Sequence, residues 1–358
     1  MSNPIRTSLI VFLYCSFHIP LCFSKSELEV YASDWQLRTD NDAMVSTVRD
    51  RNYTGGITFA QSGRRAAERV FSLDGWLGRF DRLFNIGPNK LTKDTFTNTR
   101  HSMQFGLLVF TPERISKKEP IYDDHPYSNL IFLANSRQWL SDDKNSVSRS
   151  MLLLGLFGTN TAKMVQSGLH SLIDVEEANG WDNQISDGGE PTFRYSLSKT
   201  RFWKSNYSRT FTAYDISTTL EGNAGYTTDI NAGLSLRLGK IHALGWYSLP
   251  DPSDHFTAAY APLITQEGNR DSEIFFLAGV NARLRVYNVL LQGQFRHSEV
   301  TYAYSDLNPL IGEAWIGAAA AFSNGWQASF VVRARTREFE AEQSFRQVWG
   351  GLTVTRVW

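Results

Sequence analysis

Cysteine is almost absent from the 358-residue chain, and its two cysteines, Cys15 and Cys22, both lie near the N-terminus. The apolar run 9–23 follows a basic residue and ends in small side chains, which predicts a cleavable secretory signal over residues 1–24. The alternatives are an uncleaved anchor and a lipid-modified Cys22. The run is shorter than the roughly 20 residues that a membrane span needs. The mature domain, residues 25–358, would then contain no disulfide.

Net charge and long apolar runs are also lacking. Lys plus Arg and Asp plus Glu are balanced at 36 each, so no overall field would draw the chain to nucleic acid. After the expected signal no stretch of about 18 apolar residues occurs, which excludes transmembrane helices. Glycine-rich phosphate loops, His-Glu-x-x-His, paired-cysteine metal sites and Gly-x-Ser-x-Gly are missing, which argues against the familiar cofactor and serine enzymes.

The chain instead shows alternation with a period of two residues, which is typical of strands with one apolar face. In 231–238, apolar residues alternate with Asn, Gly, Ser and Arg, and 279–286 and 327–337 repeat the pattern with arginines at successive polar positions. Such arginines would be prohibitive in the dry core of a soluble sandwich, whereas a wet barrel lumen tolerates them. The 10 Trp, 14 Tyr and 23 Phe would supply the aromatic girdles of a transmembrane barrel.

Strand-like segments define the expected fold, an all-β antiparallel transmembrane β-barrel of about 12 strands. Because bacterial barrels have an even number of strands, one of thirteen candidates must be wrong. We expect the long polar stretches to be extracellular loops, and Ser323-Asn324-Gly325 to be a periplasmic hairpin turn. The long stretches are 62–100, 112–126, 159–191 and 250–271. The candidate strands are 27–36, 53–61, 102–111, 127–138, 149–158, 192–203, 210–224, 227–239, 272–287, 289–298, 314–324, 326–339 and 347–358.

One extracellular loop departs from the strand pattern and predicts an amphipathic helix from Ala162 to Ala178. Its apolar residues form one stripe, and Gln166, His170 and Asp174, spaced by four, lie in line on another side. The stripe consists of Val165, Leu169, Leu172 and Ile173. The following Asn179-Gly180 is a good helix stop.

Oxygen-bearing side chains cluster in the segment Asp40-Asn41-Asp42, which is followed by Tyr53-Thr54-Gly55-Gly56. Carboxylate and amide oxygens suit a hard cation such as calcium, and Thr54 could orient a partner by its hydroxyl. A turn followed by the start of a strand explains the same residues.

Two further groups carry possible chemistry. Lys117 and Lys118, upstream of Asp123-Asp124-His125-Pro126-Tyr127, could hold phosphate groups of a glycolipid, or could belong to a solvated loop. His170, with Glu176 nearby and Gly180-Trp181-Asp182-Asn183-Gln184 after it, is a natural base for ester hydrolysis near neutral pH. A single helical histidine is more often structural, so the residues alone leave both interpretations open.

Taken in order, these groups resemble the lipid A 3'-O-deacylase family of Gram-negative outer membranes. The resemblance is strongest over residues 38–200. It rests on Asn41-Asp42, Tyr53-Thr54-x-Gly, Lys-Lys-x-Pro at 117–120, Asp124-x-x-Tyr127, and Gln166-x-x-x-His170 leading into Gly180-Trp181-Asp182-Asn183-Gln184. It implies a twelve-stranded barrel with an outward-facing active site between the barrel wall and a loop helix. It also implies calcium dependence and hydrolysis of the 3'-linked acyloxyacyl chain of lipid A.

Carried over residue by residue, the resemblance implies His170 as catalytic base, and Asn41 and Asp42 as calcium ligands. It implies that Lys117 and Lys118 bind a lipid A phosphate, and that Thr54 and Glu176 order the site. The chain departs from the family pattern in two places. Lys118 stands where an arginine is found, which loses a bidentate fork, and Ala178 replaces a tyrosine. We expect a monomer that acts on lipid A or lipopolysaccharide.

Two other functions fit a barrel of this kind. A structural or porin-like barrel would tolerate replacement of His170, Asn41 and Asp42 and would conduct ions. An outer-membrane phospholipase would release fatty acid from vesicles that lack lipid A.

Overall fold

The computed structural model describes residues 29–45, 52–87, 99–141, 145–173, 177–206, 208–241, 272–341 and 346–358. For residues 52, 169–173 and 209 it describes the backbone alone. The expected signal over 1–24 lies outside the described residues, as does Glu176. In the described part of the chain no helix is long and apolar enough to cross a membrane.

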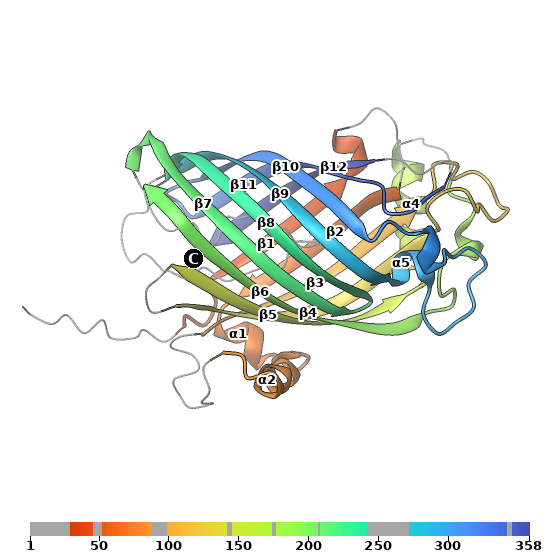
Figure 1. Ribbon diagram of the computed structural model, residues 1–358, viewed down its shortest axis with the longest axis horizontal. Coiled ribbons are helices and arrows are strands. Elements are labelled where there is room, and N and C mark those ends of the chain that lie inside the picture. Colours follow the sequence, from red (N-terminus) through yellow and green to blue (C-terminus); the bar gives the residue numbers. More distant parts are fainter. Residues whose placement is uncertain are drawn as a thin grey trace, which may run out of the picture.

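The described chain forms a closed barrel of twelve antiparallel strands, which confirms the expected fold class. Figure 1 shows how the strands run around the barrel. Each strand pairs with its neighbours in sequence, and β1 closes the barrel against β12. The strands are β1 (Asp34–Asn41), β2 (Asn52–Ser62), β3 (Thr99–Thr111), β4 (Ser128–Leu140), β5 (Ser146–Phe157), β6 (Glu190–Asn206), β7 (Ser208–Gly225), β8 (Thr227–Ile241), β9 (Glu273–Asn288), β10 (Leu310–Ala321), β11 (Trp326–Arg335) and β12 (Gln347–Val357).

The thirteenth candidate strand, 289–298, is wrong. Its first residues form the short helix α5 (Val289–Gln292), whose N-terminus is capped because the Asn288 side chain accepts a hydrogen bond from the Leu290 amide at 3.1 Å. Gly293, at φ 71°, ends the helix. These start and stop residues were visible in the sequence, but the apolar run between them is too short to separate helix from strand.

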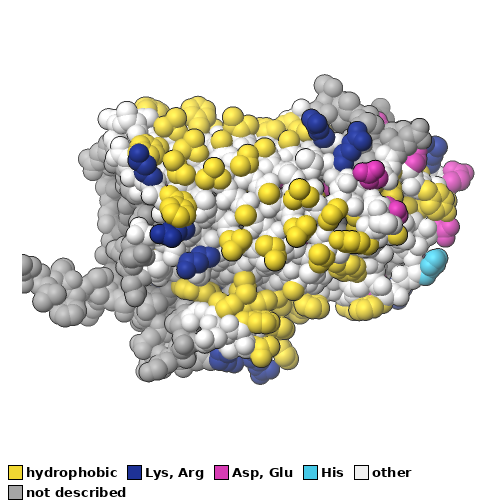
Figure 2. Space-filling model, in the orientation of Figure 1, with side chains coloured by type: hydrophobic (Ala, Val, Ile, Leu, Met, Phe, Trp, Pro, Cys, Tyr) yellow, Lys and Arg dark blue, Asp and Glu magenta, His cyan; other side chains and the backbone are white. Residues whose placement is uncertain are grey.

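Alternation divides each strand between an apolar outer wall and the lumen. On β8, Leu234, Leu236 and Leu238 are exposed, whereas Asn231 and Arg237 are buried. The expected pattern also holds on β9 and β11, although Arg337 lies beyond the end of β11 and is exposed. Figure 2 shows hydrophobic side chains spread over the wall, with Lys and Arg gathered toward its two ends. The wall is therefore suited to contact with lipid.

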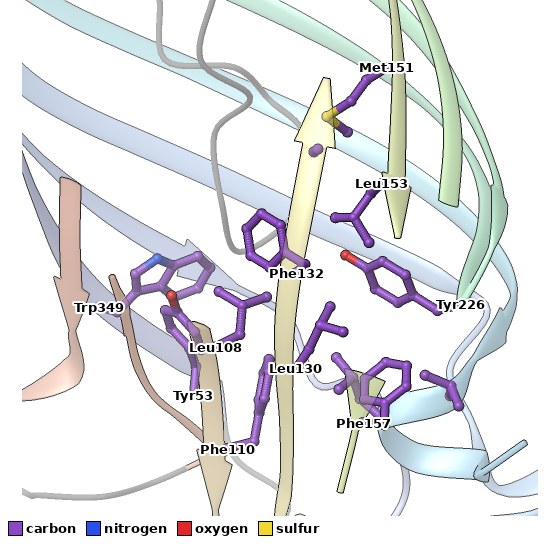
Figure 3. Packing of buried hydrophobic residues seen from close by; sticks show 13 residues of the cluster. Tyr53, Leu108, Phe110, Leu130, Phe132, Met151, Leu153, Phe157, Tyr226 and Trp349 are labelled. Atoms are coloured by element: carbon purple, nitrogen blue, oxygen red, sulfur yellow. The ribbon is translucent and has the colours of Figure 1, made fainter. Parts of the chain in front are cut away.

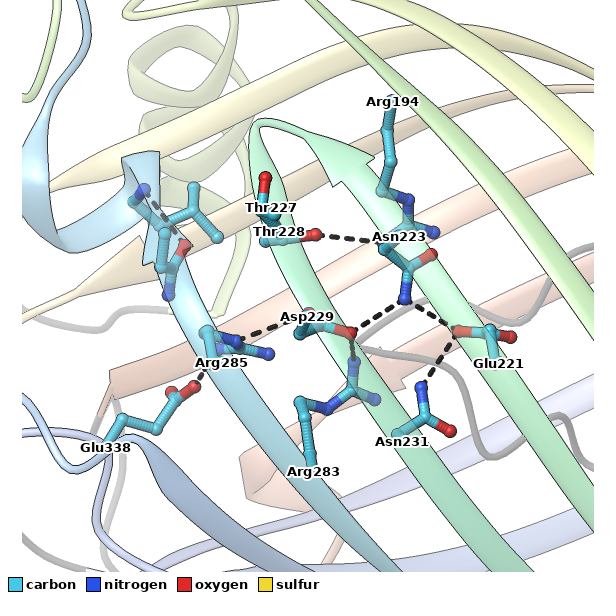
Figure 4. Close-up of polar contacts among 12 residues, drawn as sticks. Arg194, Glu221, Asn223, Thr227, Thr228, Asp229, Asn231, Arg283, Arg285 and Glu338 are labelled. Carbon is cyan, nitrogen blue, oxygen red and sulfur yellow. Dashed lines mark hydrogen bonds and ion pairs between the residues drawn. The ribbon is translucent and has the colours of Figure 1, made fainter. Parts of the chain in front are cut away.

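The lumen arginines are compensated by ion pairs. Arg283 lies 2.8 Å from Asp229, and Arg285 pairs with Glu338 (Figure 4). The same arrangement recurs where Glu313 binds Arg333 and Arg335 at 2.9 and 2.8 Å. Beside this network, an apolar cluster that includes Phe110, Phe132 and Trp349 fills part of the lumen (Figure 3). Paired charge therefore lets the lumen hold these arginines at burial of 95% or more.

The barrel has two distinct ends. At the terminal end Asp34 pairs with both Ser62 and Val357, and at the loop end Asn41 pairs with Gly55 and Gly350. The Ser323-Asn324-Gly325 turn lies at the terminal end, between β10 and β11. Its role as a hairpin turn is confirmed.

The expectation that all four long polar stretches share one end is wrong. Stretches 112–126 and 159–191 leave the loop end, but 62–100 joins β2 to β3 at the terminal end. The stretch 250–271 lies outside the described residues, and its flanking strands β8 and β9 also meet at the terminal end. Antiparallel strands alternate in direction, so strand order rather than loop length decides where a connection lies.

Helices occur at both ends. α1 (Arg64–Glu68) and α2 (Asp74–Leu83) follow β2, and α4 (Thr161–Ile173) follows β5 (Figure 1). The single-turn 3-10 helices are η1 (Asp42–Met44), η2 (Trp181–Asn183) and η3 (Tyr304–Asp306). α4 confirms the existence of the helix expected in the 159–191 loop, but the expected end at Ala178 is wrong, because Glu177 and Ala178 are not helical.

Candidate active site on the outer wall

A β-bulge at the loop end of β2 turns the Thr54 side chain to the outer wall. The β2–β3 register shifts between Tyr53 and Gly55, which places Tyr53 inside, where its hydroxyl donates to Asp40 at 3.3 Å. Thr54 instead meets Thr111 of β3, with their hydroxyl oxygens 2.6 Å apart. Thr111 shares the outer side of β3 with the exposed Phe105. Bulges commonly redirect a side chain in this way.

The two glycines after Thr54 lie where a side chain would clash with its neighbours. A Cβ atom on Gly55 would lie 2.5 Å from the Asp40 carbonyl oxygen, and one on Gly56 would lie 2.7 Å from the Tyr53 hydroxyl. Gly55 is therefore explained by the close approach of β1, and Gly56, the glycine of the Tyr53-Thr54-x-Gly motif, by the packed Tyr53 side chain and β3.

The acidic cluster at the end of β1 is divided by the barrel wall. Asp40 faces the lumen, where Arg38 donates to it at 2.8 Å. Asn41 lies on the outer side with the exposed Leu37, and its side chain accepts a hydrogen bond from the Ala43 amide at 2.6 Å. Asp42 begins η1 and is buried. The structure thus brings Asn41 and Thr54 onto neighbouring strands and leaves Asp40 in the lumen network.

The loop with the two lysines is joined to the segment that follows α4. The Asn179 amide donates to the Ile115 carbonyl at 2.8 Å, and the Asn183 side chain donates to the Lys118 carbonyl at 2.8 Å. A Cβ atom on Gly180 would meet the ring of Tyr127 at 2.5 Å, so glycine is required there. The side chains of Lys117 and Lys118 are exposed. They are therefore free to meet a ligand while their backbone is held.

Trp181 fastens α4 to the outer wall. The indole is 1% exposed and packs with Ile115, Tyr127, Ala162 and Ala178, and this cluster contacts Val109 on the outer side of β3. Its ring nitrogen donates to Gln166 of α4 at 2.9 Å. This cluster is apolar and packed, so it fixes the helix to the wall.

Among the α4 side chains that the structure describes, the buried ones do not include Val165 of the expected apolar stripe. Ala162 and Gln166 are buried, whereas Val165 is 42% exposed. His170 continues the spacing of four from Gln166, which puts its position on the same side of the helix backbone. Its side chain lies outside the described residues.

Two other histidines with described side chains occupy structural positions. His125 is 1% exposed, stacks on Phe110 and contacts the Pro126 carbonyl at 2.7 Å, and burial lowers its pKa. His101 is equally buried and pairs with Glu29 at 2.7 Å. His297, the third such histidine, is exposed. The structure therefore gives His125 and His101 packing roles rather than access to an ester.

Asp124 stabilises the 112–126 loop, which carries Lys117 and Lys118, through hydrogen bonds inside that loop. Its two carboxylate oxygens accept hydrogen bonds from the Glu113 and His125 amides at 2.8 and 2.7 Å. Burial raises the pKa of Asp124 to about 6. Tyr302 adds a hydroxyl donated to the Asp124 carbonyl at 2.7 Å. Asp124-x-x-Tyr127 is therefore a motif that shapes the loop.

The oxygen donors at the loop end fit a hard cation in chemistry. Asn41, Asp42 and Thr54 offer amide, carboxylate and hydroxyl oxygens and no nitrogen or sulfur, the donor type that calcium prefers. Within the described ranges no group of three or more His, Cys, Asp or Glu could hold a metal.

Sequence reasoning missed several residues of this region. Thr111, the partner of Thr54, carries no local signal, because the contact depends on the bulge and on a strand almost 60 residues away. Tyr302, which braces Asp124, lies in a segment whose start was assigned to a strand. Trp181 was recognised only as part of a motif, and its packing role comes from the tertiary structure.

Taken together, an apolar outer wall, a charged lumen and a helix fastened outside the wall define a β-barrel of the bacterial outer membrane. A family model described as "Outer membrane protein LpxR" matches residues 9–358. The chain therefore belongs to the LpxR family.

The comparison with one solved structure supports the fold. The chain is similar to LpxR from Salmonella typhimurium at a TM-score of 0.69 and 16% identity, covering 91% of this chain and 100% of that one. The β domain of the Bordetella autotransporter BrkA aligns at a TM-score of 0.41 and 8% identity, over 91% and 99% of the two chains. A search of curated proteins found no match.

Proposed function

We propose that the protein is a calcium-dependent esterase that hydrolyses the 3'-linked acyloxyacyl chain of lipid A. The observation that carries this proposal is the attachment of α4 outside the barrel, where Trp181 and Gln166 hold it against β3. A site between wall and helix lets the acyl chains stay in the lipid while the head group reaches polar residues.

In this proposal His170 is the general base. It takes a proton from a water molecule, and the oxygen of that water adds to the ester carbonyl. When the tetrahedral intermediate collapses, the sugar oxygen leaves and receives the proton from His170. The products are the free acyloxyacyl acid and lipid A with a 3'-hydroxyl group.

The outer-wall residues would bind and orient the substrate around this base. Asn41 and Asp42 would hold calcium, which when bound supplies Lewis-acid stabilisation of the developing oxyanion. The hydroxyl of Thr54, fixed by Thr111, would order the polar edge of the site, and Glu176 would act with it. Lys117 and Lys118 would hold a lipid A phosphate through charge-assisted hydrogen bonds.

The test is mass spectrometry of lipid A after incubation with detergent-purified protein, with calcium and with a chelator. We expect loss of the 3'-acyl mass with calcium only, and no loss with His170→Ala. His297→Ala is the matched control, because the His297 side chain is exposed in the connection between β9 and β10. This variant should keep full activity. Activity retained in His170→Ala would refute the proposed base. Unchanged lipid A from a folded barrel, with fatty acid released from phospholipid vesicles, would instead favour a phospholipase.

A further inference from the structure

Helices α1 and α2 lie on the outer wall of the barrel, toward the terminal end (Figure 1). The buried side of α2 packs onto the wall. Leu73 and Leu77 meet Leu152 and Tyr195, and Leu133 joins the same cluster. Leu152 lies near the middle of β5, on the side that carries the exposed Leu154. α2 therefore covers wall that would otherwise face lipid.

A polar network beneath α2 also joins the helix to the wall. Arg137 of β4 is on the side of Leu133, and it binds both carboxylate oxygens of Asp74 at 2.7 and 2.6 Å. Asp81 accepts hydrogen bonds from the Tyr195 and Ser150 hydroxyls at 2.9 and 3.0 Å. Without α2, Arg137 would face lipid without these carboxylates, which is unfavourable for a charged side chain. The helix pair is thus a fixed part of the wall.

Apolar side chains are exposed on the side of the helix pair that faces away from the wall. Trp76 and Leu83 are 58% and 76% exposed, and Val70 and Phe71 before α2 are also exposed, whereas Phe84 stacks on Tyr195 at the wall. Figure 2 shows hydrophobic side chains gathered over this region and adjoining those of the barrel wall, with Lys and Arg along its outer edge. The apolar face of the helices therefore continues the lipid-facing wall.

Two arginines of α2 are exposed beside these apolar side chains. Arg79 and Arg82 of α2 are exposed, and the Arg79 guanidinium lies 4.7 Å from the ring of Trp76. A tryptophan next to arginines on an apolar helix face is typical of side chains at the boundary between acyl chains and head groups. Arginine can place its charge among lipid phosphates while its stem stays apolar.

We propose that α1 and α2 form a lipid-binding element that seats in the phospholipid leaflet at the terminal end of the barrel. Trp76 and Leu83 enter the acyl region, and Arg79 and Arg82 bind lipid phosphates. In barrels of this class short connections face the periplasm, and the short connections from β4 to β5, from β6 to β7 and from β10 to β11 join strand ends at the terminal end. The leaflet concerned is therefore the periplasmic one, away from the candidate active site. The inference does not depend on the proposed esterase activity.

The first test measures where Trp76 lies. Full-length protein and Trp76→Phe are reconstituted into vesicles containing brominated phosphatidylcholine, and the difference between their tryptophan emission spectra isolates Trp76. Trp203→Phe is the matched control, because Trp203 is 59% exposed on the wall strand β6. We expect the bromolipid to quench Trp76 as strongly as Trp203. Quenching of Trp76 by aqueous iodide and not by bromolipid would overturn the proposal and leave a surface for a protein partner.

The second test measures how much Arg79 and Arg82 contribute to the binding of anionic lipid. Anionic phosphatidylglycerol bound to the purified protein is counted by native mass spectrometry for wild type, Arg79→Gln, Arg82→Gln and Arg337→Gln. Each basic residue near an anionic membrane surface contributes about fivefold in affinity, so each α2 variant should lose about that much. Arg337 is exposed at the loop end, and its variant should retain the lipid. Equal retention in all four proteins would overturn the head-group contact.

Discussion

Replacement of Trp181 by alanine should release α4 from the outer wall without unfolding the barrel. The indole is 1% exposed, and its partners Ile115, Tyr127, Ala162 and Gln166 lie outside the strand ladder. Removing a buried tryptophan costs about 3–5 kcal/mol. Here the loss should reduce the free energy with which α4 docks on the wall. Because 1.4 kcal/mol is a factor of ten, the docked state should become at least about 100-fold less favoured.

Hydrogen exchange by mass spectrometry reads this change directly. Amides of 161–173 should exchange about 100-fold faster in Trp181→Ala, while amides of β8 remain unchanged, and lipid A hydrolysis should fall with the docked population. Trp181→Phe keeps most of the packing and loses the hydrogen bond to Gln166, a cost of about 1 kcal/mol or about fivefold in exchange. Unchanged exchange in α4 together with faster exchange in β8 would refute the assignment of Trp181 as the fastener of this helix.

Three other predictions test the loop, the lysines and the lumen. Burial raises the pKa of Asp124 from 3.8 to about 6. Protonation of Asp124 therefore stabilises the folded loop at low pH. This contribution, at most about 3 kcal/mol, should be lost as the pH rises from 4 through 6. Exchange of 113–127, corrected for intrinsic rates, should show this loss, and Asp124→Asn should remove the pH dependence; a pH-independent wild type would contradict it. Lys117→Ala and Lys118→Ala should each raise KM for lipid A about tenfold or more, and should have no effect with dephosphorylated lipid A; equal effects on both substrates would exclude a phosphate contact. Asp215→Ala leaves the fully buried Arg237 without its carboxylate and should lower the unfolding free energy by about 3–5 kcal/mol in a urea titration, whereas a loss below about 1 kcal/mol would show that the pair contributes little.

The fold could be predicted largely from the sequence because alternation is a local property. The positions of Leu234 and Arg237 on opposite sides of β8 follow from a period of two, and the wall and lumen confirm them. The strand predicted over 289–298 was wrong because a short apolar run fits a helix as well as a strand. Only contacts with the core at the loop end select the helix. The sequence also did not predict at which end of the barrel the connection 62–100 lies, because this depends on the direction of every preceding strand.

The candidate site was predictable in its residues and much less in its geometry. Asn41, Thr54 and Lys117 were identified from motifs, and the structure places their backbones around the loop end of β1, β2 and β3. The division of Asp40 from Asn41 by the wall follows from strand alternation. The bulge that turns Thr54 outward does not, because it requires the packing of Tyr53 inside the barrel.

The sequence by itself determined that this protein has an apolar surface, a charged interior and a helix in a polar loop, because each property is encoded within a few neighbouring residues. The tertiary structure alone decided that Trp181 fastens α4 beside β3, and that Arg137 fixes α2 to the wall. Those contacts join residues distant in the chain, and their energies depend on burial that no local pattern specifies.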